Sequence, residues 1–136
     1  MTFNTKKLLD QIDEVEALEF LASMIRFKSY SGTTGETDLA HFMVKRMRAM
    51  GLHAAVQDVE DSRYNAIGTL KGNGSGQSLM FNGHMDTNPA TNDWTIDPWA
   101  GHYDDEFIYG IGVSNMKSGD AAAFMAVKTI VDAKIQ

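Results

Sequence analysis

The sequence predicts an α/β fold, because stretches with helical and with strand patterns alternate along its 136 residues. Apolar residues in steps of three and four predict helices near both ends of the chain. Between them lie short apolar stretches separated by glycine-rich turns, a pattern typical of strands. Hydrophobic residues make up 43% of the chain, which is enough for a core of its own.

Two helices are expected within the first 51 residues. From Thr5 to Phe27 the apolar residues draw one continuous stripe, which predicts a packing helix. The polar segment Ser29–Thr34 ends this pattern, and Thr33 followed three residues later by Glu36 has the form of a capping box. A second helix with a methionine-rich core face is therefore expected from Thr33 to its stop at Gly51.

The rest of the chain predicts strands and one further helix. Strands are expected over residues 52–59, 65–70 and 78–81, with a turn and a short strand over 103–109. Glycines in residues 71–76 mark a flexible turn. A helix rich in Ala and Val is expected from about Ser118 to Ala133. Trp94 and Trp99 are interpreted either as the floor of a pocket or as a cover for the core edge.

Two glycine-rich segments have to be weighed as nucleotide-binding loops. Residues 71–76 lack a following Lys-Ser or Lys-Thr pair and lead into a strand, whereas a phosphate loop leads into a helix. Gly110 and Gly112 do precede a helix, but Asn115 stands where a dinucleotide-binding turn requires its third glycine. A dinucleotide-binding domain is therefore the less favoured alternative.

The composition restricts the partners and the metal ligands. Twelve basic and 18 acidic residues give a net charge of −6, which argues against nucleic acid as a partner. No apolar run approaches the roughly 18 residues that span a bilayer, and the amino terminus lacks a signal-peptide core. A soluble cytoplasmic protein without membrane contact is expected. Because the chain has no cysteine, a metal would be bound by His, carboxylate or amide groups.

His84 and Asp86 are the first candidate site residues. They follow an apolar stretch and stand two positions apart, so in extended backbone both side chains face the same side. A neutral imidazole is a good zinc ligand, and a nearby carboxylate can fix its tautomer. Without further support, a polar loop after a buried strand explains the triplet equally well.

A second motif, further along the chain, makes the His84 and Asp86 pair a more specific signal. Gly83-His84-Met85-Asp86-Thr87 is followed by Trp94, by Pro98, and by the glycine-punctuated segment 109–119, which includes Asn115-Met116-Lys117-Ser118-Gly119. Together these resemble the zinc metallopeptidase and deacylase family that includes acetylornithine deacetylase, succinyl-diaminopimelate desuccinylase, aminoacylase and carboxypeptidase G. The resemblance covers essentially the whole chain.

The resemblance implies a three-layer αβα zinc-hydrolase catalytic domain, of which residues 1–136 are the amino-terminal portion. His84 would bind zinc, and Asp86 would support His84 and assist catalysis. Asn115 stands where the family has an Asp that bridges two zinc ions, and Ile111 stands where it has Arg. The catalytic Glu-Glu pair, further ligands and a dimerisation domain would lie beyond Gln136, so the full-length protein is expected to be a homodimer.

The resemblance predicts metal-dependent hydrolysis of an amide bond in a peptide or N-acyl amino acid, catalysed by the full-length protein. We expect the 136-residue chain alone to be inactive. An amide offers one good oxygen and no charge, so Asn115 should weaken the second metal site and leave either a single tight ion or a weakened pair. The metal would be zinc, or in its place cobalt or manganese. Two alternatives remain at this point: Asn115 merely caps the following helix, or the protein is a non-catalytic ligand-binding member of the fold.

Overall fold

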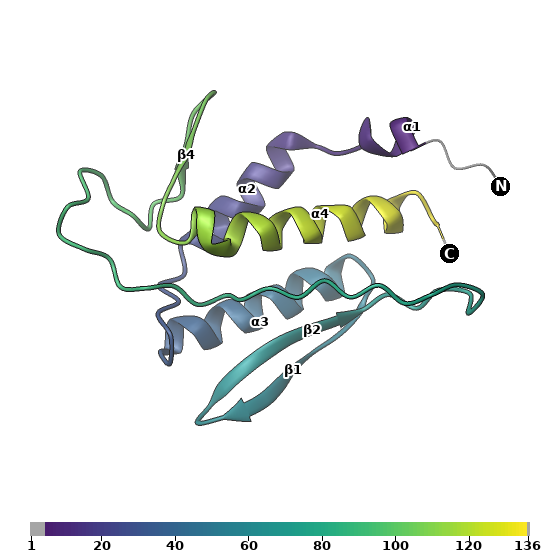
Figure 1. Cartoon of the computed structure of the whole chain (residues 1–136), viewed down its shortest axis with the longest axis horizontal. Helices are drawn as coiled ribbons and strands as arrows, with labels where there is room; N and C mark the ends of the chain where they lie inside the picture. Colours follow the sequence, from purple (N-terminus) through teal and green to yellow (C-terminus); the bar gives the residue numbers. More distant parts are fainter. Residues whose placement is uncertain (1–4, 136) are drawn as a thin grey trace.

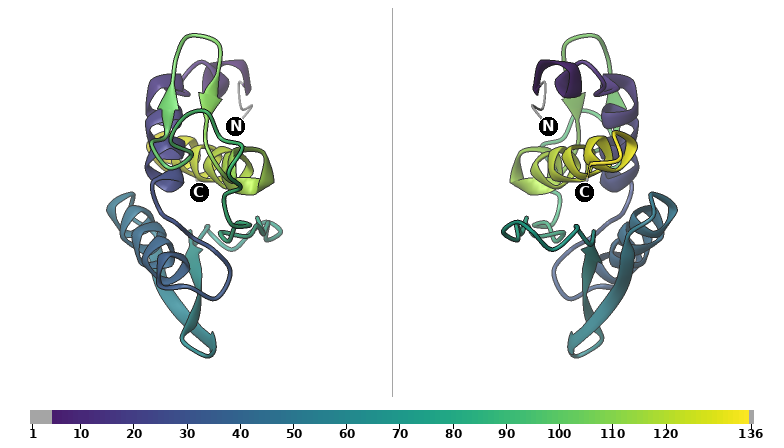
Figure 2. Two further views of the ribbon diagram at one scale, coloured as in Figure 1. Left: turned by 90° about the vertical axis from the view of Figure 1, so that its left-hand side faces the viewer. Right: turned by 90° about the vertical axis from the view of Figure 1, so that its right-hand side faces the viewer.

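The computed structural model describes residues 5–135, which form helices, two short hairpins and long connections (Figure 1). The elements in chain order are α1 (Thr5–Leu9), α2 (Glu14–Ile25), α3 (Thr34–Ala49), β1 (His53–Glu60), β2 (Arg63–Thr69), β3 (His102–Tyr103), β4 (Ile108–Tyr109), η1 (Val113–Lys117) and α4 (Ser118–Asp132). In Figure 2, α3 and the β1–β2 hairpin lie at one end, and α2, α4 and the β3–β4 hairpin lie at the other. None of the helices within residues 5–135 is long and apolar enough to cross a membrane.

The single helix expected over residues 5–27 is in fact two helices, so the prediction of one continuous helix was wrong. Residues 10–13 separate α1 from α2. The cause is Asp13, whose carboxylate accepts a hydrogen bond from the Glu16 backbone N–H at 3.0 Å and caps α2. An aspartate in this role satisfies an orphan N–H of the first helical turn, and it starts a new helix within an uninterrupted apolar stripe.

Helix α3 begins where the capping box predicted, with Thr33 as its N-cap residue. The expected side-chain bonds are absent, because Thr33 makes no capping bond to the helix. The Glu36 carboxylate instead accepts from the Gly32 N–H at 2.7 Å and pairs with Arg63 at 2.8 Å. Glu36 therefore joins the start of α3 to strand β2.

Strands β1 and β2 confirm the two strands expected after Gly51 and form an antiparallel pair from His53–Thr69 to Glu60–Arg63. The hairpin packs against α3. Residues 78–81 are extended but have no paired neighbour among the described residues, which differs from the expected strand. Leu79 and Met80 in this segment are 78% and 79% exposed.

The core lies between α2, α3 and α4. Its buried apolar side chains are Phe20, Leu21, Met24, Ile25, Leu39, Met43, Ala121, Phe124 and Met125. The rings of Phe20 and Phe124 stack with centroids 4.1 Å apart. Helix α4 is thereby fixed against α2, and the turn that precedes it comes to lie beside the His84 segment.

Candidate functional site

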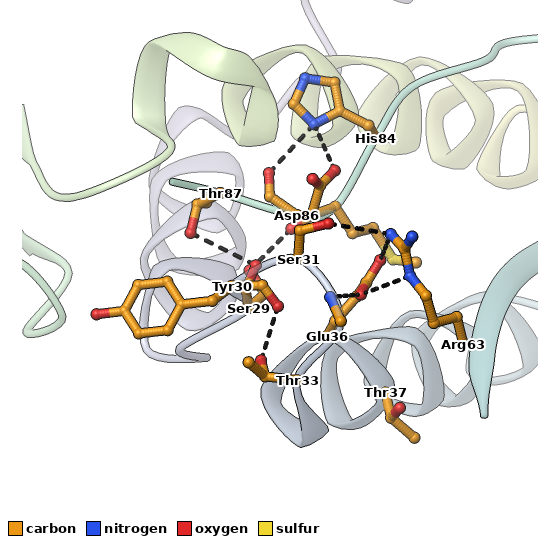
Figure 3. A network of polar contacts seen from close by, with 12 residues as sticks. Ser29, Tyr30, Ser31, Thr33, Glu36, Thr37, Arg63, His84, Asp86 and Thr87 are labelled. Carbon is orange, nitrogen blue, oxygen red and sulfur yellow. Dashed lines mark hydrogen bonds and ion pairs between the residues drawn. The ribbon is translucent and has the colours of Figure 1, made fainter. Parts of the chain in front are cut away.

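His84 lies between Asp86 and Asn115, the two residues that the motifs paired with it. Its Nδ1 is 3.1 Å from both the backbone oxygen and Oδ1 of Asp86 (Figure 3). Its Nε2 is 2.9 Å from Asn115 Oδ1, across 31 positions of sequence. The structure thus brings all three sequence-predicted site residues together.

The loop that carries His84 and Asp86 is fixed to the segment after α2. The buried Ser29 hydroxyl donates to the Met85 carbonyl at 2.8 Å, and the Thr87 N–H donates to the Ser29 carbonyl at 2.7 Å (Figure 3). Tyr30 and Thr87 form a parallel bridge. Sequence reasoning missed Ser29, because a serine in a polar connection carries no signal of its role.

A second set of contacts joins the segment after α2, which supports this loop, to the β1–β2 hairpin. Arg63 Nη2 donates to Glu36 Oε1 at 2.8 Å and to the Ser31 hydroxyl at 3.3 Å (Figure 3). Hydrogen bonding and charge at Glu36 raise the pKa of Arg63, and the negative charge of Asp86 adds to this shift. Arg63 therefore places a fixed positive charge within electrostatic reach of the candidate catalytic carboxylate.

The oxygen atoms around the His84 ring favour its protonated form. Both ring nitrogens face oxygen atoms, at Asp86 and at Asn115, whereas a neutral imidazole has only one N–H to donate. The hydrogen bond to Asn115 is the main cause that raises the pKa of His84, with contributions from Asp86 and opposition from burial. A metal ion at Nε2 would therefore replace a proton.

Asn115 does not cap helix α4, so that alternative was wrong. The N-cap position of α4 is occupied by Lys117. Asn115 lies in the irregular turn η1 with non-helical backbone angles of −141° and 89°, and a cis peptide bond joins it to Met116. Its side chain bonds to His84 instead.

The donor set of this site is only part of a zinc site. Catalytic zinc usually has three protein ligands and a water. His84 Nε2 and Asn115 Oδ1 can supply two, while Asp86 faces the other ring nitrogen. Within residues 5–135 no group of three His, Cys, Asp or Glu side chains is placed to bind a metal ion. These residues fit as contributors to a zinc site and do not complete one.

Asp120, in the first turn of α4, is a half-buried carboxylate that sequence reasoning missed. Its buried Oδ2 atom has no hydrogen-bond partner among residues 5–135, and a Cβ atom at Gly83 would collide with its Oδ1. Burial raises the pKa of Asp120 from its ordinary 3.8 to about 6, although the positive charges of His84 and Lys117 oppose the shift. The residue thus costs stability in its charged form.

We expect Asp120→Asn to raise the free energy of unfolding at pH 7 by about 1 kcal/mol, after allowance for screening by solvent. The unfolded chain loses this proton near pH 3.8 and the folded chain near pH 6, so Asp120 lowers stability as the pH rises through this interval. Urea unfolding between pH 3.5 and 7 should show that the variant lacks this fall. The exposed Asp38→Asn should retain it, and an equal slope in both variants would contradict the assignment.

The two tryptophans have different roles. Trp94 lines an open pocket that also includes Asn115. The ring of Trp99 packs edge-on against Tyr30 at 5.2 Å, and the Lys117 ammonium lies 5.9 Å from its centroid. Trp94 therefore fits the pocket interpretation, and Trp99 fits the interpretation as a cover for the core edge.

Comparison with known proteins shows which proteins this chain is similar to. Residues 80–136, which contain His84, Asp86 and Asn115, match the model of Peptidase family M20/M25/M40. This chain is a relative of the M20/M25/M40 peptidases. It is 32% identical to the succinyl-diaminopimelate desuccinylase of Aliarcobacter butzleri over 84% of its own length and 30% of the relative's. It is also 32% identical to the acetylornithine deacetylase of Vibrio parahaemolyticus over 83% of its own length and 31% of the relative's.

The fold agrees with that of a solved structure. Human carnosine dipeptidase 1 matches with a TM-score of 0.79 over 96% of this chain and 32% of that protein, at 19% sequence identity. This likeness confirms the predicted fold class. The chain spans about a third of the length of the relatives it matches.

Proposed function

We propose that residues 1–136 form the amino-terminal portion of the catalytic domain of a longer M20-type hydrolase, which splits an amide bond in an N-acyl amino acid or a peptide. The observation that carries the proposal is His84 placed between Asp86 and Asn115 within the segment that matches the family. The desuccinylase and deacetylase names of its relatives agree with amide hydrolysis. The match covers only 30% of the desuccinylase, and the described residues supply too few ligands for a zinc site. Both observations agree with a longer protein.

In this proposal His84 binds the metal through Nε2, and Asn115 contributes its side-chain oxygen. Asp86 holds the imidazole through Nδ1, which fixes the ring orientation and increases its basicity. Zinc would polarise the amide carbonyl and lower the pKa of a bound water. The longer protein would also contain the dimerisation domain and would act on small substrates as a homodimer. It would reside in the cytoplasm, which agrees with the absence of cysteine from these 136 residues.

The test is metal-dependent turnover. The longer protein should hydrolyse members of a panel of N-acyl amino acids and dipeptides, lose the activity on treatment with a chelator, and regain it with zinc. The 136-residue chain alone should show no turnover. Activity that survives complete metal removal would contradict the proposal, as would zinc-dependent turnover by the short chain.

We expect Asn115→Asp to strengthen binding of the second metal ion by about tenfold or more in the longer protein. A carboxylate offers one anionic oxygen to each of two ions, whereas the amide offers one neutral oxygen. Metal content after dialysis against a weak chelator should rise from about one equivalent to two. Asn92→Asp, which makes the same change in an exposed loop, should leave the content unchanged, and two equivalents in the unaltered protein would contradict the hypothesis.

A non-catalytic ligand-binding member of the fold is the second candidate. The observation that favours it is Asn115 itself, an uncharged amide at the position where the resembled family has a metal-bridging carboxylate. The turnover panel separates the two candidates, because a binding protein would retain a substrate-like ligand and release no product. The dinucleotide alternative has no comparable observation in its favour.

A further inference from the structure

An open pocket of about 400 Å³ adjoins the candidate site. Eleven residues line it, and none carries a charge, although 22% of the chain is charged. The apolar part of the lining includes Trp94, Ile108 and Ile111, and the polar part includes Thr87, Ser114 and Asn115. The volume lies in the range of pockets that bind small molecules.

The pocket is continuous with the candidate site through Asn115. This residue lines the pocket and also places its Oδ1 atom 2.9 Å from His84 Nε2. A substrate whose amide bond lies at His84 would therefore direct one of its two flanking groups into the pocket. The charge of the pocket lining determines which of these two groups enters the pocket.

The charged side chains next to the pocket are engaged elsewhere. Both ring nitrogens of His84 already face oxygen atoms, of Asp86 and of Asn115. The stem of Lys117 lies beneath Gly112, but its ammonium donates to the carbonyls of Met24 and Phe27 at 3.0 and 3.1 Å. The carboxylate of Asp86 faces His84 Nδ1. No described lining residue can thus neutralise a charged ligand group, and an unpaired charge out of water is costly.

We propose that this pocket binds the acyl side of the substrate and selects a neutral acyl group, which rests on the proposed amide hydrolysis. The amine side of an N-acyl amino acid or dipeptide carries an α-carboxylate, for which the pocket offers no cation. The first residue of a free dipeptide carries an ammonium, for which it offers no carboxylate. A neutral acyl chain places its apolar end against Ile108 and Ile111 while its amide edge meets the polar rim.

The experiment is a nitrogen-15 NMR titration of the 136-residue chain with two probes of similar shape, N-butyrylglycinamide and N-succinylglycinamide. The butyryl probe ends in a methyl group where the succinyl probe ends in a carboxylate. We expect amide shifts at Ile111, Gly112 and Ser114 with the butyryl probe, and binding of the succinyl probe weaker by about tenfold. Equal or tighter binding of the succinyl probe would overturn the proposal, as would the absence of pocket shifts with both probes.

Ser114→Lys adds a cation at the exposed rim of the pocket without burying it. It should tighten binding of the succinyl probe by about threefold to tenfold and change butyryl binding less than about twofold. Ser75→Lys, in the exposed turn before residue 78, should change neither. If Ser114→Lys fails to alter succinyl binding, the pocket is not the binding site and the proposal is wrong.

Binding is measured here without turnover, so the two proposals fail separately. A longer protein that hydrolyses succinyl substrates faster than butyryl substrates would retain the proposed function and overturn the neutral-acyl selection. A protein without hydrolysis whose pocket still prefers the butyryl probe would lose the proposed function and retain the selection.

Discussion

Replacing Lys117 with alanine is expected to lower the free energy of unfolding by about 3 kcal/mol. The side chain is fully buried, and its ammonium donates to the carbonyls of Met24 and Phe27 where α2 ends. Alanine would leave a cavity between α2 and η1 and remove both hydrogen bonds. It would also remove a positive charge from the carboxyl end of a helix, where a cation is favourable. Urea unfolding measures the change.

Two comparison variants separate the causes. Lys117→Met fills most of the volume but cannot donate, so the difference between methionine and alanine measures packing alone. Lys128→Met removes a partly exposed lysine paired with Glu16 and Asp132, and should cost less than about 1 kcal/mol. An alanine variant at position 117 as stable as the unaltered chain would contradict the structural role.

The same lysine has a pH signature. Burial lowers the pKa of Lys117 from 10.5 to about 8, against an opposing effect of Asp120. Between these pH values the unfolded chain binds the proton and the folded chain does not, so this group makes stability rise with pH over that interval. The rise should be absent in Lys117→Met.

The sequence predicted elements best where local patterns decide them. The start of α3 at Thr33 and the β1–β2 hairpin follow from periodicity and turn residues. The break at Asp13 was missed although Asp13 and Glu16 have the spacing of a cap, because the apolar stripe continues through it. Residues 78–81 have the composition of a strand, but pairing requires a neighbouring strand, which local pattern cannot supply.

The site was predictable only in its motif residues. His84, Asp86 and Asn115 were named from spacing and resemblance, and the structure places them together. Their supports come from distant parts of the chain and involve common residue types. Arg63 reaches Glu36 across 27 positions, and Lys117 reaches Met24 across 93. Such contacts depend on how whole helices and strands pack together, so local sequence patterns do not predict them.

Replacing His84 with alanine is expected to lower zinc affinity and turnover of the longer protein by well over a hundredfold. Loss of a residue that merely supports a metal ligand costs about tenfold to a hundredfold, and His84 is proposed as the ligand itself. The folded chain should change little in stability, because the His84 side chain is 44% exposed. Calorimetric zinc titration and initial rates on an N-acyl amino acid measure the two losses.

Asp86→Asn distinguishes a ligand from its support. An asparagine still reaches His84 Nδ1 but no longer offers a negative charge there, so the loss should be about tenfold to a hundredfold, smaller than for His84→Ala. Since Asp86 acts through His84, adding Asp86→Asn to His84→Ala should cause almost no further loss, and additive losses would show that Asp86 acts on its own. His53→Ala, at an exposed histidine on β1, is the matched control and should retain full zinc affinity. Equal zinc binding by His84→Ala and His53→Ala would remove His84 from the metal site, and with it the chemical basis of the proposed hydrolase.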